Sequence, residues 1–162
     1  MASEKQAQIL FLKYAFPCAG ITLARGHITQ DEFTLLKTAL KKELPIPWET
    51  LERIFPPAWR RIFETAKILH TNPHSLDTIR TYYLEFHNAY IEKNDGSYRF
   101  APPVLKELCR VERAPVREVQ KNYYLVAIKK NIRPVSNFIC PDAEEGTIVS
   151  VHYAYAIEKL DP

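Results

Sequence analysis

The spacing of apolar residues changes once along this chain, near Cys109, and this change constrains the fold more than any other feature. Before it, apolar residues recur at helical intervals, whereas the residues after it form short segments rich in Val, Ile and Tyr. The first pattern is typical of amphipathic helices and the second of β-strands. The sequence therefore predicts an α+β chain, with an all-helical domain over residues 1–105 and a small β-barrel domain over residues 106–162.

Local signals place the helices of the first domain. Thr29 and Glu32 form a capping-box sequence, which predicts a helix that ends before Pro45. Prolines and a further N-cap residue, Ser75, divide the rest of the apolar pattern. The other predicted helices cover residues 9–23 with an interruption around Pro17, residues 48–54, a segment starting near Ala58, a segment from Ser75 to the turn at 94–96, and residues 104–108.

The second domain is predicted to contain closely spaced strands. Asn122 and Asn131 are expected at hairpin turns, since Asn tolerates the left-handed backbone that such turns require. A closed barrel is favoured because closure removes the exposed edges of an open sheet. The predicted strands cover residues 110–119, 123–129, 132–139, 147–153 and 154–160.

Composition argues against several classes of protein. The formal charge of +3, from 22 basic and 19 acidic residues, is too small and too mixed for a nucleic-acid footprint. No apolar run reaches the roughly 20 residues of a membrane span, and the first residues lack a secretory pattern, so we expect a cytoplasmic protein. There is no catalytic triad, phosphate-binding loop or dinucleotide fingerprint, and the sequence has only four glycines to build one, which disfavours an enzyme.

Cysteine and histidine spacing offers few metal-binding patterns. Cys18, Cys109 and Cys140 are an odd number at wide spacing, which suits neither a disulfide framework nor a paired-thiolate zinc site. His70 and His74 have the spacing of helical metal ligands, but Pro73 should end the helix between them. We therefore expect no metal site at these two histidines.

Two motifs carry a resemblance to a known family. Residues 141–161 read PDAEEGTIVSVHYAYAIEKLD, and residues 108–111 read LCRV, followed by VREV at residues 116–119. Together they resemble the HypC family of nickel-iron hydrogenase maturation chaperones, whose signature combines an opening cysteine, Val-Val-Glu-Ile, Pro-Asp-Ala, Val-x-Val-His and Ala-Gly-Phe-Ala-Ile. The resemblance covers about residues 108–161 and implies a small barrel similar to an OB fold.

The resemblance also implies a site and partners. Cys109 falls on the family's cysteine, which binds an iron dicyano-carbonyl fragment shared with the HypD scaffold, and His152 falls on the family's histidine. A thiolate is a strong ligand for low-spin iron, and an imidazole beside it can bind the metal or hydrogen-bond the thiolate. The implied partners are a HypD-like scaffold or the precursor of a hydrogenase large subunit. The partner-binding residues that we predict are Val116, Glu118, Val151, Tyr153 and Tyr155.

The expected function is therefore that of an accessory protein in the maturation of hydrogenase or a related metalloenzyme. Adjacency of the first and fourth predicted strands would bring Cys109 and His152 together. One alternative is a protein–protein interaction module in which Cys109 is a small core side chain and His152 a hydrogen-bonded residue at a turn. A binder of single-stranded nucleic acid is a further alternative, which the weak net charge disfavours.

Overall fold

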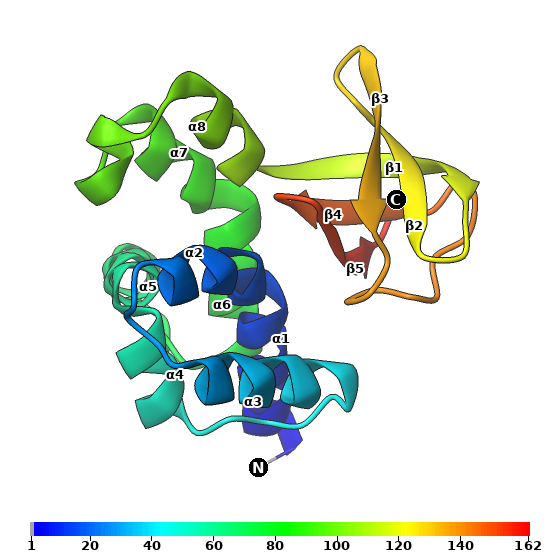
Figure 1. The fold of residues 1–162 in the computed structure, drawn as a ribbon. Coiled ribbons are helices and arrows are strands. Elements are labelled where there is room, and N and C mark those ends of the chain that lie inside the picture. The colour runs from blue at the N-terminus through cyan, green and yellow to red at the C-terminus, as the bar shows by residue number, and fades with distance from the viewer. Residues whose placement is uncertain (1) are drawn as a thin grey trace. The chain divides into compact units, whose positions relative to one another are not determined.

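The computed structural model of this chain describes residues 2–162 and divides into two compact units (Figure 1). The helical unit ends at Phe86, and the sheet unit comprises His87–Pro162. The predicted α+β organisation is confirmed, since the N-terminal part of the chain is helical and the C-terminal part contains a sheet. The sheet unit also includes residues 87–105, which the sequence pattern places in the helical domain.

Prolines and capping residues set the ends of the helices in the helical unit. Thr29 accepts a hydrogen bond from the Glu32 backbone, and the Glu32 carboxylate accepts one from the Thr29 backbone, which confirms the predicted capping box. The predicted interruption at Pro17 is confirmed as a 3₁₀ turn, η1. The elements are α1 (Ala2–Ala15), η1 (Phe16–Cys18), α2 (Ala19–Ala24), α3 (Gln30–Lys41), α4 (Trp48–Ile54), α5 (Pro56–Leu69), α6 (Leu76–Thr81) and a π-helical turn η2 (Tyr82–Phe86).

Aromatic side chains form the core of the helical unit. The Phe11 ring lies 4.7 Å from that of Trp59, and the Tyr14 ring stacks on Tyr83 at 4.5 Å between centroids. These four side chains are buried, whereas Phe63 is 38% exposed. The aromatic residues of these helices therefore serve mainly for packing, as their helical spacing predicts.

One helical stretch meets the length and composition of a membrane span. It runs over Ser3–Ala24 with a mean hydropathy of 1.4. Lys13 and Pro17 interrupt its apolar residues, so the stretch contains no continuous apolar run of that length. Core helices and signal sequences pass the same test, and Phe11 and Tyr14 of this stretch are fully buried.

The sheet unit begins with short helices and continues as strands. Its elements are α7 (His87–Glu92), η3 (Gly96–Phe100), α8 (Pro103–Cys109), β1 (Val111–Val119), β2 (Tyr123–Ile128), β3 (Asn131–Ser136), β4 (Ile148–His152) and β5 (Tyr155–Leu160). Antiparallel pairing joins β1 to β2 and β4, β2 to β3, and β4 to β5. β3 and β5 meet in parallel at one residue pair, Ser136 and Tyr155.

Two turns of the sheet unit differ from the prediction. Asn131 is the first residue of β3 and pairs with Ile128, so its prediction as a turn residue is wrong. The left-handed backbone occurs earlier, at Lys129 (φ 55°), because a two-residue hairpin turn needs it at its first position. The segments predicted as adjoining strands are separated by a turn at Tyr153 (φ 53°) and Ala154. Asn122 lies in the connection between β1 and β2, as predicted.

One buried tyrosine fastens the long β3–β4 connection to the sheet. The Tyr124 hydroxyl donates to the backbone carbonyl of Cys140 at 2.6 Å and accepts from the backbone N–H of Ala143 at 3.1 Å. Burial raises the pKa of Tyr124, which keeps the hydroxyl protonated as a donor. The core beneath this loop consists of Ala114, Val116, Tyr124, Val126, Ile128, Val135, Cys140, Ala143, Val149, Val151 and Ala156.

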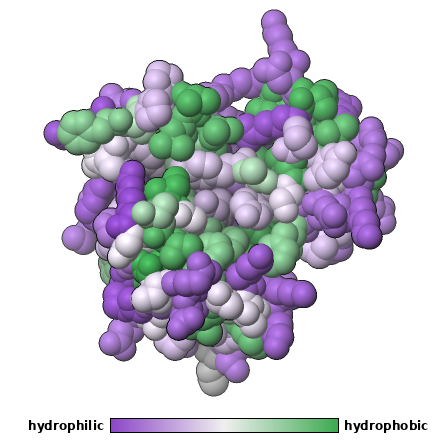
Figure 2. Space-filling view, viewed as in Figure 1, coloured by the Kyte–Doolittle hydropathy of each residue, from purple (hydrophilic) through white to green (hydrophobic). Residues whose placement is uncertain are grey.

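The molecular surface mixes charged and apolar side chains. Hydrophilic residues cover much of the face in Figure 2, with apolar patches between them. In the sheet unit the most exposed large apolar side chain is Phe100 (84%), followed by Val104 (67%). Val104 and Leu108 lie one turn apart on α8, the helix that ends at Cys109.

Candidate functional site

Cys109 and His152 lie side by side in the sheet unit. Cys109 is the last residue of α8 and His152 is the last residue of β4. The Cys109 Sγ atom lies 3.8 Å from His152 Nε2, although 43 residues separate the two in sequence. Both side chains are buried, at 2% and 1% exposure. The predicted adjacency of the first and fourth strands is confirmed, because Val111 of β1 pairs with His152 of β4.

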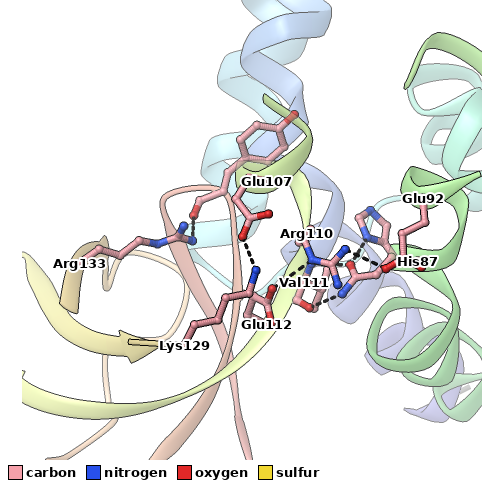
Figure 3. Close-up of polar contacts among 10 residues, drawn as sticks. His87, Glu92, Glu107, Arg110, Val111, Glu112, Lys129 and Arg133 are labelled. Carbon is pink, nitrogen blue, oxygen red and sulfur yellow. Dashed lines mark hydrogen bonds and ion pairs between the residues drawn. The ribbon is translucent and has the colours of Figure 1, made fainter. Parts of the chain in front are cut away.

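Main-chain hydrogen bonds fix this juxtaposition. The Tyr153 N–H donates to the Leu108 carbonyl at 3.0 Å, so the residues that flank Cys109 and His152 are bonded to each other. The Tyr153 carbonyl in turn accepts from Arg133 Nη2 at 3.0 Å (Figure 3). These bonds hold Tyr153 in its left-handed conformation, which is uncommon for a bulky residue. The sheet register, and not only the side chains, therefore holds Cys109 beside His152.

Tyr98 adds a hydroxyl group beside the sulfur atom. It lies in η3, and its Oη atom is 3.1 Å from Cys109 Sγ. This distance is within hydrogen-bonding range for sulfur. A phenol hydroxyl that donates to a thiolate stabilises the charged form of the sulfur.

His87 is a second imidazole close to Cys109. It is 3% exposed, and its ring centroid lies 5.1 Å from that of His152 with the planes at 76°. Burial lowers the pKa of His87, the nearby His152 lowers it further, and hydrogen bonds with Cys109 and Asn88 oppose these effects. Burial thus favours the neutral form of the His87 ring.

Asn88 connects His87 to the first strand. Its Nδ2 donates to the Val111 carbonyl and its Oδ1 accepts from the Val111 N–H, both at 2.9 Å. The same Oδ1 lies 3.2 Å from His87 Nδ1 (Figure 3). α7 is thus fixed to β1 next to the position where β1 meets His152.

Ion pairs link the short helices to the sheet around the site. Arg110 contacts Glu92 of α7 at 3.0 Å and Glu112 of β1 at 3.2 Å, while Lys129 contacts Glu107 of α8 at 2.7 Å (Figure 3). The hydrogen bond that Arg110 donates to Glu92 raises the pKa of Arg110, and the one that Lys129 donates to Glu107 lowers the pKa of Glu107. These pairs are partly exposed, so each contributes little stability. Their effect is to position α7 and α8 relative to the strands.

The residues predicted to bind partners are not gathered on one surface. Val116 and Val151 are buried in the sheet core, at 1% and 0% exposure, so their side chains pack inside and present no contact surface. Glu118 is exposed near the far end of β1. Tyr153 and Tyr155 are half-buried on either side of the turn that follows His152. The Tyr153 ring lies 5.2 Å from that of His152, and Tyr155 pairs with His152 across β4 and β5.

Sequence reasoning missed His87 and Tyr98. The two histidines considered from the sequence lie elsewhere: His70 is an exposed, left-handed residue after α5, and His74 lies in the following loop, where it contacts Glu52 at 2.7 Å. One signal for His87 was available. It falls four residues before Ile91 and four after Tyr83, and both of these are buried. A histidine on an apolar helical stripe is a candidate for a buried role.

Two comparisons with known proteins add no match. No family model matches the chain, and no curated protein is detectably similar to it.

Proposed function

We propose that this chain is an accessory protein in the maturation of hydrogenase or a related metalloenzyme, and that Cys109 and His152 bind its iron cargo. The observation that carries the proposal is the distance of 3.8 Å between Cys109 Sγ and His152 Nε2. The resemblance to the HypC family singles out these same two residues. Their proximity supports the proposal that the two residues form a site of the kind that the resemblance implies. In this proposal the protein is a cytoplasmic carrier and not an enzyme.

The proposed fold is a closed, OB-like barrel of the HypC type. The strand order β1-β2-β3-β5-β4, with β1 paired to β4, supports it, because the order returns to its starting strand. In such a barrel, the parallel contact of Ser136 with Tyr155 would be the point of closure. Closure would leave few edges for unwanted strand pairing.

The donor atoms fit an iron cargo. A metal about 2.3 Å from a thiolate and about 2.0–2.1 Å from an imidazole nitrogen can lie between two such atoms with a small adjustment of either side chain. Soft thiolate and borderline imidazole ligands suit iron. Tyr98, at 3.1 Å from the sulfur, would stabilise the thiolate that binds the metal.

The proposed docking surface surrounds Cys109. Val104 and Leu108 on α8 are exposed apolar side chains, and Tyr153 and Tyr155 flank the turn after His152. Apolar and aromatic residues next to a site are suited to a protein partner. A HypD-like scaffold or a large-subunit precursor, which gives or receives the iron fragment, is the partner that this arrangement suits.

Vibrational spectroscopy tests the cargo. The full chain, co-expressed with the hydrogenase maturation proteins and purified without oxygen, should show infrared bands of bound carbonyl and cyanide. Cys109→Ala should abolish the bands, whereas Cys140→Ala should retain them, because Cys140 is an equally buried thiol at 4% exposure. The proposal fails if the wild-type protein lacks the bands or if Cys109→Ala keeps them.

The burial of both residues favours one other candidate function. Buried cysteine is often a small core hydrophobe, and Cys109 is only 2% exposed. The chain would then be a protein–protein interaction module without metal. In that case Cys109→Ala and wild type would both lack the bands and would capture the same partner from the co-expressing cells with equal yield.

A further inference from the structure

We infer that His87 is a third donor of this site, so that Cys109, His152 and His87 together offer one thiolate and two imidazoles to a single metal ion. The inference deepens the metal-binding role proposed above and rests on it. His87 lies outside the stretch that resembles the HypC family, which begins near residue 108. The sheet unit thus adds a donor that the resemblance does not supply.

Ring contacts place His87 beside the other imidazole. Its ring meets that of His152 edge to face at 5.1 Å between centroids, and His152 Nε2 lies 3.8 Å from the Cys109 sulfur. All three side chains are no more than 3% exposed. Burying polar side chains costs folding free energy unless they hydrogen-bond each other or bind a ligand.

The Asn88–Val111 pair fixes which nitrogen of His87 carries the proton. Asn88 Nδ2 donates to a backbone carbonyl, so its Oδ1 is identified as the acceptor of the Val111 N–H. His87 Nδ1, at 3.2 Å from that Oδ1, must therefore be the N–H donor. In a neutral ring the lone pair then belongs to Nε2. This is the arrangement of metal-binding histidines, whose second ring nitrogen donates to a fixed acceptor.

The donor set indicates the kind of ion. One thiolate and two neutral imidazoles suit divalent iron, cobalt or zinc and are poor ligands for magnesium or calcium. Three protein ligands also leave a coordination position open, as in sites that exchange a bound group. The site would therefore hold the metal while leaving room for ligands that the cargo brings.

Cobalt(II) added alone to the full chain, without oxygen, tests the donor set independently of any iron fragment. The thiolate-to-cobalt charge-transfer band reports Cys109, and the d–d bands report the number and type of the other ligands. His87→Ala should weaken cobalt binding at least about tenfold and shift the d–d bands while the charge-transfer band persists. His27→Ala is the matched control, because His27 is an exposed histidine, and should leave affinity and spectrum unchanged.

Two results would overturn the inference. An unchanged affinity and spectrum in His87→Ala would remove His87 from the site. A weaker affinity with unchanged d–d bands would show that His87 positions Cys109 without binding the metal.

A measurement on the wild-type protein avoids dependence on the folding of the variant. Nitrogen NMR of the histidine rings, recorded before and after addition of zinc(II), should show shifts of both His87 and His152. A shift of His152 alone would also overturn the inference.

The iron-fragment proposal can be tested separately from the role of His87. Infrared bands without a role for His87 would leave the iron-fragment proposal intact. Cobalt binding through three donors without infrared bands would refute the iron cargo only.

Discussion

The hydroxyl of Tyr124 offers a strict test of how the sheet unit is held together. Tyr124→Phe removes one oxygen atom from a fully buried side chain and leaves the ring in place. That oxygen bonds two main-chain groups of the β3–β4 connection, the carbonyl of Cys140 and the N–H of Ala143. Both residues are 5% exposed or less, so the variant leaves two buried polar groups without this partner.

The expected loss of stability follows from these two groups. An unsatisfied buried donor or acceptor costs about 1–3 kcal/mol, so the pair should cost roughly 2–4 kcal/mol after some relaxation of the loop toward water. Because each 1.4 kcal/mol is a factor of ten, protected amides of β2 and β3 should exchange roughly 30- to 700-fold faster.

The assay must read the sheet unit alone. Both tryptophans of the chain, Trp48 and Trp59, lie in the helical unit, so tryptophan fluorescence would not report the strands. Native-state hydrogen exchange of the strand amides gives the opening free energy directly. Tyr123→Phe is the matched control, because the neighbouring Tyr123 is 41% exposed, and should change that free energy by less than about 0.5 kcal/mol. Equal effects of the two substitutions would refute the role assigned to the buried hydroxyl.

Two further predictions concern the capping box of α3. Thr29→Ala should destabilise the helical unit by about 0.5–2 kcal/mol, measured by urea denaturation followed by tryptophan fluorescence. The control Thr34→Ala, at an exposed position within the same helix, should cost less stability. Equal losses of stability in the two variants would contradict the capping role. Hydrogen bonds from the Thr29 backbone and from Arg53 lower the pKa of Glu32 below its ordinary value of 4.5. The contribution of the Glu32 carboxylate to stability is therefore present above about pH 4.5 and is lost as the pH falls through the lowered pKa. In Glu32→Gln, the free energy of unfolding should therefore fall less steeply as the pH is lowered. An unchanged pH dependence would contradict this role of Glu32.

Elements with local signals were predictable from the sequence. The structure confirms the helix cap predicted at Thr29 and the helix break predicted at Pro17. It also confirms the helix start predicted at Ser75. Each of these signals acts on the helix next to it. The strands were also located within a few residues, since Val, Ile and Tyr-rich segments are separated by polar turns. The turn at Lys129 was misplaced because lysine carries no local preference for the left-handed backbone that the hairpin imposes there.

The site was predictable only in part, for a physical reason. Cys109 and His152 were found through a sequence resemblance, and strand adjacency supplied their contact. His87 and Tyr98 approach Cys109 through the packing of α7 and η3, which depends on contacts that no local pattern encodes. The burial of Val116 and Val151 likewise depends on which face of each strand turns inward.

The hydrogen bond between Leu108 and Tyr153 and the pairing of Val111 with His152 use only main-chain atoms. They do not depend on which side chains occupy positions 109 and 152. A descendant of this chain that replaced either residue would still present the two positions to each other. The frame therefore allows the chemistry at these two positions to change one residue at a time, while the fold that surrounds them is inherited unchanged.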